Sequence, residues 1–203
     1  MKRLAAVAAA MLGLLVAPTA ASAHPLGNFT INHYAGIEVA GSDVYVRYAL
    51  DVAEIPTYQM GADLRRPGYP AALAKDLELK LDGRRVPLRV VAHRVSTRPG
   101  AGGLRTLRLD VVYRADGHGT ALAFDDGSFP GRIGWREVTV SARDGGRVLE
   151  SDVATTSTSD QLRKYPTDLL RSPLDVSSAE ATVDLGSTPG SAPKLEGAVA
   201  TAH

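Results

Sequence analysis

The chain has 203 residues, with 23 Lys and Arg against 22 Asp and Glu, and it has no cysteine. This balance of charge gives no electrostatic reason to bind nucleic acid or an anionic membrane surface, and the lack of cysteine excludes disulfide bonds. A domain of about 150 residues buries roughly 70% of the surface that its unfolded chain exposes, so one domain with a proper core is possible.

Residues 1–23 have the pattern of a secretory signal peptide. Lys2 and Arg3 precede the charge-free stretch "LAAVAAAMLGLLVA", and Ala21-Ser22-Ala23 has the small residues of a cleavage site. The apolar stretch spans about 14 residues, fewer than the roughly 20 that cross a bilayer as a helix, which disfavours a retained membrane anchor. We therefore expect a secreted or periplasmic mature chain of 180 residues (203 minus 23) without a membrane span.

Residues 29–153 alternate between apolar and polar side chains, most clearly in "DVYVRYALDV" at 43–52. Turn residues at 41–43 and 82–83 each separate two alternating runs and predict hairpins. Further strands are expected in "LRTLRLDVVYR", "TALAFDD", "WREVTVSA" and "RVLESDV". About seven to nine short strands predict a mainly β fold, an antiparallel immunoglobulin-like sandwich, with a barrel as the alternative.

The alternation breaks at residues 55–77, where only "PAALAKDL" has helical propensity, so one short helix or an ordered loop is expected there. Residues 154–172 predict one or two amphipathic turns packed on the domain. From Gly186 onward, Gly, Ser, Pro and Ala predominate, which indicates a disordered C-terminal tail. The predicted organisation is a β-sandwich domain at 24–176 and a flexible tail at 177–203.

Cleavage after Ala23 would give His24 a free α-amine beside its own imidazole, and the two together can chelate a nickel, copper or zinc ion. Pro25 has no amide hydrogen to ionise, and Leu26 occupies the third position. This excludes the square-planar terminal site that uses deprotonated amides and a third-position histidine. The alternative is an exposed histidine that merely follows the cleavage site.

Additional metal ligands are expected among His33, Asp51 and Glu54. His33 shares strand parity with Phe29 and Ile31, which favours a histidine in or near the core over a ligand. Asp51 and Glu54 lie where the long strand ends in "LDVAEIP", and their alternative role is that of solvated carboxylates at the end of the domain.

The stretch "DDGSFPGRIGWREV" contains the single tryptophan, Trp135. We expect Trp135 to anchor the core, and Arg132, Arg136 and Glu137 to fix the turn by charge-assisted hydrogen bonds; ligand stacking on Trp135 is the alternative. The sequence has no G-x-S-x-G, no H-E-x-x-H and no phosphate-binding glycine loop, so we expect no enzyme activity.

Four segments, "AHPLGNFTINHY", "YALDVAEIPTYQ", "FPGRIGWREV" and "LRKYPTDLLRSPLDV", resemble the exported amino-terminal region that precedes the membrane part of some bacterial nickel/cobalt transporters of the NicO type. The resemblance implies a bacterial source and a periplasmic or extracellular domain that works beside a membrane metal permease. The family's membrane helices and their histidine-containing motifs are not in this sequence, so no transport residue is carried over.

The leading hypothesis is therefore an exported accessory domain of a nickel/cobalt transport system that binds the metal, nickel, cobalt or copper, through His24. The alternative is a structural or protein-interaction sandwich without a metal, and a sugar- or peptide-binding sandwich ranks third. A free histidine terminus separates the first two, because only a metal-binding domain needs it.

Overall fold

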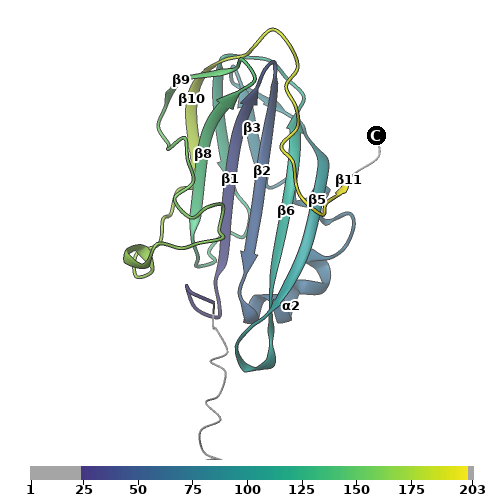
Figure 1. Ribbon diagram of the computed structural model, residues 1–203, viewed down its shortest axis with the longest axis vertical. Coiled ribbons are helices and arrows are strands. Elements are labelled where there is room, and N and C mark those ends of the chain that lie inside the picture. Colours follow the sequence, from purple (N-terminus) through teal and green to yellow (C-terminus); the bar gives the residue numbers. More distant parts are fainter. Residues whose placement is uncertain (1–23, 201–203) are drawn as a thin grey trace, which may run out of the picture.

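The computed structural model describes residues 24–200, so the predicted signal peptide lies outside the described residues. The strands are β1 (Ile31–Ala40), β2 (Asp43–Val52), β3 (Leu77–Leu81), β4 (Arg84–Val86), β5 (Leu88–Pro99), β6 (Arg105–Ala115), β7 (Ala121–Asp126), β8 (Arg136–Arg143), β9 (Arg147–Ser151), β10 (Ser178–Asp184) and β11 (Val199–Ala200). They form a large sheet in the order β11-β5-β6-β2-β1-β8 and a small sheet in the order β4-β3-β7-β10-β9 (Figure 1). The mainly β, antiparallel-rich sandwich is confirmed. The two separate sheets contradict the barrel alternative.

Both predicted hairpins are present. β1 and β2 pair antiparallel from Ile31↔Val52 to Ala40↔Asp43, and β3 pairs with β4 across a turn in which Asp82 and Gly83 have positive φ. Side chains alternate between the two faces of a strand, so the pairs His33↔Leu50 and Asn32↔Asp51 lie on opposite faces. The first pair faces the small sheet, and the second pair belongs to the outer face.

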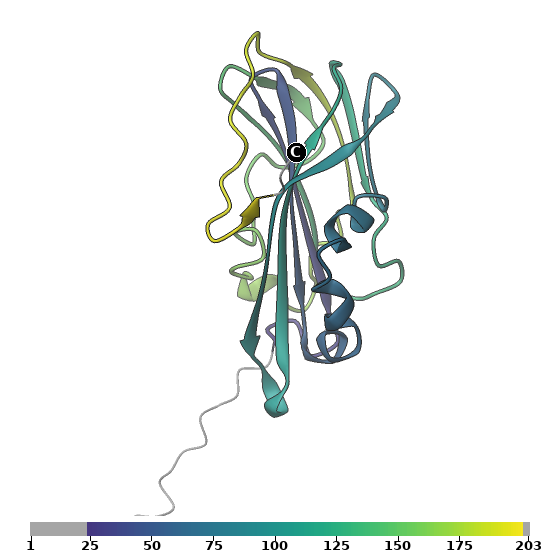
Figure 2. The same ribbon diagram turned by 90° about the vertical axis from the view of Figure 1, so that its right-hand side faces the viewer.

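Two helices, α2 (Glu54–Leu64) and α3 (Tyr69–Leu73), cover the half of the inner face that the small sheet leaves open (Figure 2). One short helix or an ordered loop is expected from the sequence at 55–77; the short helix near residue 70 is present as α3, and α2 is a second helix that the sequence did not indicate. Pro56 and Gly61 lower the helical propensity of α2, which is why the sequence did not indicate it. Its Leu64 is buried in the core, so tertiary packing decides the conformation. None of the helices in residues 24–200 is long and apolar enough to cross a membrane.

The predicted start of the tail at residue 177 is wrong, because β10 is an internal strand of the small sheet between β7 and β9. Ala179, Ala181 and Val183 alternate along β10 and are buried against the core. Two of these three side chains are only methyl groups, so the period of two in "SAEATVD" is a weak hydrophobic signal.

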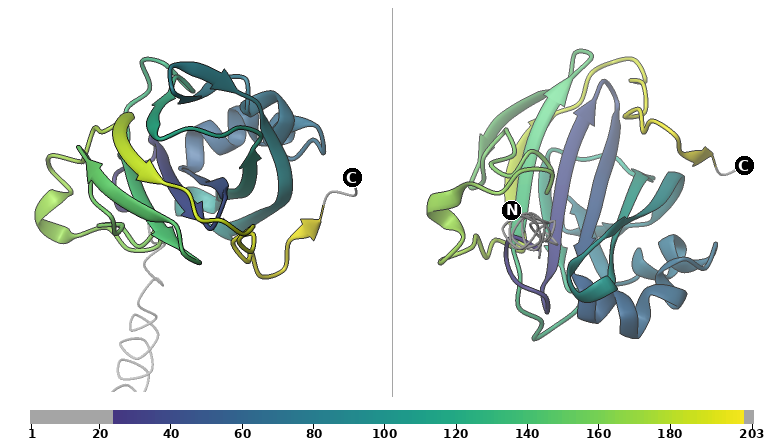
Figure 3. Two further views of the ribbon diagram at one scale, coloured as in Figure 1. Left: turned by 90° about the horizontal axis from the view of Figure 1, so that it is seen from above. Right: turned by 60° about the horizontal axis from the view of Figure 1, so that its bottom comes forward.

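Residues 185–200, the C-terminal strap, run across the outer face of the large sheet, on the side opposite the small sheet (Figures 2 and 3). Arg47 and Arg94 donate hydrogen bonds to the carbonyls of Lys194 and Glu196, at 3.2 and 2.8 Å, and β11 pairs with β5. The strap therefore makes defined contacts up to residue 200. The flexibility predicted for this segment stays a prediction, and residues 201–203 lie outside the described residues.

A buried polar group connects the two sheets. The Asp126 carboxylate accepts four hydrogen bonds: from Ser128 N (3.0 Å), Ser128 Oγ (2.6 Å), Tyr48 Oη (2.8 Å) and His33 Nδ1 (3.0 Å). Burial by itself raises the pKa of Asp126. The hydrogen bonds from His33, Ser128 and Tyr48, together with the charge of His33, outweigh burial and lower that pKa below its usual range. Asp126 is therefore an ionised acceptor in the folded chain.

This group predicts a pH dependence of stability. The pKa of Asp126 is lower in the folded than in the unfolded chain. The ionised Asp126 therefore adds its full contribution to the free energy of unfolding above about pH 4, and this contribution is lost as the pH falls further. We expect Asp126→Asn to unfold more easily at pH 7, by about 2 kcal/mol, because an amide cannot accept all four donors. Urea denaturation of the native protein and of Asp126→Asn between about pH 2 and pH 7 measures both the pH dependence and the loss of stability. If the free energy of unfolding changed with pH equally in the two proteins, Asp126 would not be the ionised acceptor.

Candidate functional site

The lower part of the outer face carries a row of four polar residues on four neighbouring strands. The registers Asn32↔Asp51, Asp51↔Arg108 and Ser96↔Arg108 place them side by side across β1, β2, β6 and β5. Each belongs to the face that points away from the small sheet, so a polar strip crosses the sheet there. We call these four residues the polar row.

A tight turn folds the chain back so that His24 lies over this row. Gly27 N donates to the His24 carbonyl at 2.8 Å, and Gly27 adopts a φ of 95°, which favours glycine. His24 Nε2 then lies 2.8 Å from Asp51 Oδ2, and only 4% of the His24 side chain is exposed. The alternative of an exposed histidine is therefore wrong for the described chain.

Two groups lie within hydrogen-bond distance of His24 Nε2, Asp51 Oδ2 at 2.8 Å and Asn32 Nδ2 at 3.3 Å, and the shorter contact favours a proton on Nε2. An ionised carboxylate only accepts hydrogen bonds, so Nε2–H is the donor to Asp51. Leu26 N–H lies 3.3 Å from Nδ1, and Thr30 Oγ1 lies 3.4 Å from it. In the neutral ring, Nδ1 thus keeps a lone pair and faces only long, weak hydrogen bonds.

Tyr165 is the second donor to Asp51, and the sequence did not indicate it. Its hydroxyl lies 2.6 Å from the same Oδ2, and its ring packs edge-on against His24 with centroids 5.7 Å apart. Burial, and then the negative charge of Asp51, raise the pKa of Tyr165, so the hydroxyl stays protonated. Tyr165 and Asp51 are 114 residues apart in the sequence, so only the folded chain brings them together.

His24, Asp51 and Tyr165 open onto a cleft of about 360 Å³. The hairpin of β5 and β6 contributes Ser96, Arg98, Thr106 and Arg108 to its lining. The loop before Tyr165 contributes Leu162, Arg163 and Lys164, and Pro25 follows His24. This cleft is the candidate functional site, because it combines a histidine, a carboxylate and several cations in one enclosed space.

The structure brings together only two of the four predicted metal ligands, His24 and Asp51. His33 faces the inside of the sandwich and bonds to Asp126, as its strand parity favoured. Glu54 is buried at the start of α2, where its Oε1 accepts a hydrogen bond from Ala101 N at 2.9 Å, so a solvated carboxylate is wrong there. Residues 24–200 contain no group of three or more His, Cys, Asp or Glu side chains that could hold a metal ion.

Trp135 is completely buried beside the cleft, which confirms it as a core anchor. Its Nε1 donates to Glu137 Oε2 at 3.0 Å, and its backbone N–H donates to Asn32 Oδ1 at 2.9 Å. Arg136 donates to the Phe129 carbonyl at 3.3 Å, so Glu137 and Arg136 fix the turn as expected. The role predicted for Arg132 is wrong, because its exposed side chain makes no hydrogen bond or ion pair with residues 24–200.

Truncation of Trp135 tests this anchor. We expect Trp135→Ala to lower the free energy of unfolding by about 3 to 5 kcal/mol, because it leaves a cavity and removes the indole donor to Glu137 Oε2. Ile133→Ala is the matched control, since Ile133 is 67% exposed two residues earlier, and we expect a change within about 0.5 kcal/mol. Equal melting temperatures for the two variants would show that Trp135 is not an anchor.

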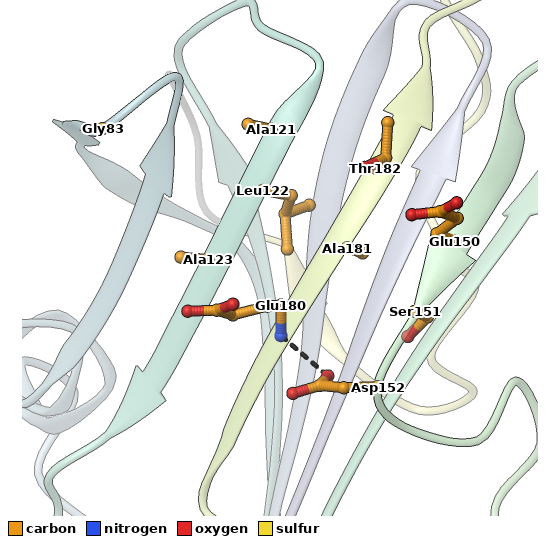
Figure 4. A pocket seen from close by; sticks show the side chains of 10 residues that line it. All are labelled: Gly83, Ala121, Leu122, Ala123, Glu150, Ser151, Asp152, Glu180, Ala181 and Thr182. Carbon is orange, nitrogen blue, oxygen red and sulfur yellow. Dashed lines mark hydrogen bonds between the residues drawn. The ribbon is translucent and has the colours of Figure 1, made fainter.

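A second hollow lies on the outer face of the small sheet (Figure 4). Alanines of β7 and β10 form its floor, and Glu150, Asp152 and Glu180 stand at its rim. Asp152 accepts a hydrogen bond from the backbone N–H of Glu180 at 2.8 Å. The hollow contains no histidine and no buried unpaired side chain, so the cleft beside His24 is the stronger candidate.

Comparison with known proteins does not assign the site. The sequence matches no protein-family model, and no curated protein matches it. The chemistry of the cleft therefore rests on its own residues.

Proposed function

We propose that the mature chain is an exported domain that binds one divalent metal ion, nickel, cobalt or copper, through the α-amine and Nδ1 of His24. The observation that carries the proposal is the hydrogen bond from His24 Nε2 to Asp51 at 2.8 Å. It holds the proton on the nitrogen far from the α-amine and leaves the Nδ1 lone pair for a ligand.

The donor set fits a chelated metal. An amine and Nδ1 of the same histidine close a six-membered ring with a metal ion, and imidazole suits nickel, cobalt and copper. Asp51 acts as a positioning residue in this proposal, since its carboxylate binds the other ring nitrogen. The scarcity of further ligand side chains nearby means that such an ion would keep open coordination positions for a group from outside the described chain.

The role beside a permease rests on the resemblance of four segments to the exported region of NicO-type nickel/cobalt transporters. A soluble metal-binding domain in that position would deliver or sense the metal. The alternative is a structural or interaction domain. Four residues lie within hydrogen-bond distance of the His24 ring and favour this alternative, because they also satisfy a histidine without a metal: Leu26, Thr30, Asn32 and Asp51.

An inserted alanine separates the two functions. A protein with one alanine before His24 keeps every side chain but moves the α-amine away from the imidazole. We expect nickel or copper to bind the native mature form with an affinity that rises from about pH 6 to about pH 8, because binding displaces protons from both nitrogens. We expect the inserted form to bind at least tenfold more weakly.

Isothermal titration calorimetry measures both forms under the same conditions, and equal melting temperatures provide the control for folding. Equal binding by the two forms, or no binding by either, would contradict the amino-terminal chelate and favour the structural alternative.

A further inference from the structure

Basic side chains outnumber carboxylates in the lining of the cleft beside His24. Arg98, Arg108, Arg163 and Lys164 contribute to it, whereas Asp51 carries the one carboxylate among the described residues that line it. Asp110, behind the cleft, neutralises Arg108 through contacts of 2.7 to 3.0 Å. Arg163 Nη1 lies 4.0 Å from Asp160 Oδ1, so Arg98 and Lys164 are the two cations of the lining without a carboxylate partner among the described residues.

These cations come from two separate elements. Arg98 pairs with Thr106 across the hairpin of β5 and β6, whereas Arg163 and Lys164 follow one another in the loop before Tyr165. The side chains of Arg98 and Lys164 are exposed and make no hydrogen bond or ion pair with residues 24–200. Positive charge without a partner among the described residues thus lines the cleft from two different elements.

The floor between the walls also offers donors. Arg108 has five N–H groups, of which two bond to Asp110, one to the Gln161 carbonyl at 2.8 Å and one to the Leu162 carbonyl at 3.3 Å. One Nη1–H remains, and Ser96 and Thr106 add hydroxyl groups to the lining. The floor can therefore donate to an acceptor placed between the walls.

The loop before Tyr165 contains three successive residues with positive φ angles. Asp160, Gln161 and Leu162 have successive φ angles of 49°, 57° and 65°, in the left-handed region that is unfavourable for residues with a side chain. Ser157 and Ser159 hold this turn by accepting hydrogen bonds from Gln161 N and Leu162 N, at 2.7 and 2.9 Å. The turn buries Leu162 and leaves the next two side chains, both cationic, at the cleft.

We propose that this cleft binds a small di- or tricarboxylate, with one carboxylate held at Arg98 and another at Lys164 and Arg163. A volume of about 360 Å³ lies at the lower end of the range for small-molecule sites, roughly 300 to 1,000 Å³. Guanidinium groups match the planar carboxylate in a bidentate geometry. A single phosphate ion engages one wall at a time, whereas a polycarboxylate spans both.

Tricarballylate is the probe, because it has three carboxylates and lacks the hydroxyl with which citrate chelates metals. We expect calorimetry to show that it binds metal-free exported protein and that inorganic phosphate binds at least tenfold more weakly. We expect the double variant Arg98→Gln/Lys164→Gln to lose at least tenfold in affinity. The control is Arg132→Gln, which removes an exposed arginine outside the cleft and should leave binding unchanged.

Because the titration contains no metal, its result is independent of the chelate proposed at His24. Both substituted residues are exposed, so the melting temperature of the double variant should equal that of the native protein. The carboxylate site is overturned by absence of tricarballylate binding, by phosphate binding of equal strength, or by equal losses in the double variant and the Arg132→Gln control.

Discussion

Asp51 Oδ2 accepts two hydrogen bonds, from His24 Nε2 at 2.8 Å and from Tyr165 Oη at 2.6 Å, and the outer face of the large sheet is organised around this atom. One donor lies at the start of the described chain and the other lies 114 residues beyond Asp51, so a single carboxylate joins two distant segments. Its position is set by the register of β1 and β2, which places Asn32 beside it. The amino-terminal turn, the loop at Tyr165 and the cleft between them all depend on this contact.

The two ligands proposed for this region, a metal ion at His24 and a polycarboxylate in the cleft, have opposite charges and use different residues. The His24 ring contacts Asp51 through Nε2 and not through Nδ1, whereas the cations Arg98 and Lys164 line the same cleft from β5 and from the loop before Tyr165. An anion there would offset positive charge that would otherwise oppose a nearby metal ion. The strain of the left-handed turn at 160–162 lies in the same wall, consistent with the tendency of such strain to occur at binding sites.

The sequence predicted the elements whose signal is local. Alternating side chains and the turn residues at Gly41 and Gly83 indicate both hairpins, because strand period and turn chemistry depend on a few neighbouring residues. α2 and β10 have weak local signals and are formed by tertiary packing. In the site, strand parity favoured an inward-facing His33. No spacing in the sequence could show that Tyr165 contacts Asp51 or that Arg98 and Lys164 line one cleft, because loops and the register of separate strands decide those positions.

The most direct test is the position of the proton on the His24 ring, measured by 15N NMR on histidine-labelled protein whose first residue is His24. When the ring is neutral, we expect its proton on Nε2, where Asp51 accepts it, and a lone pair on Nδ1. On addition of zinc, a diamagnetic stand-in for nickel, the Nδ1 resonance should shift while the Nε2 proton remains. A proton on Nδ1 in the metal-free protein, or coordination of zinc by Nε2, would contradict the role assigned to Asp51.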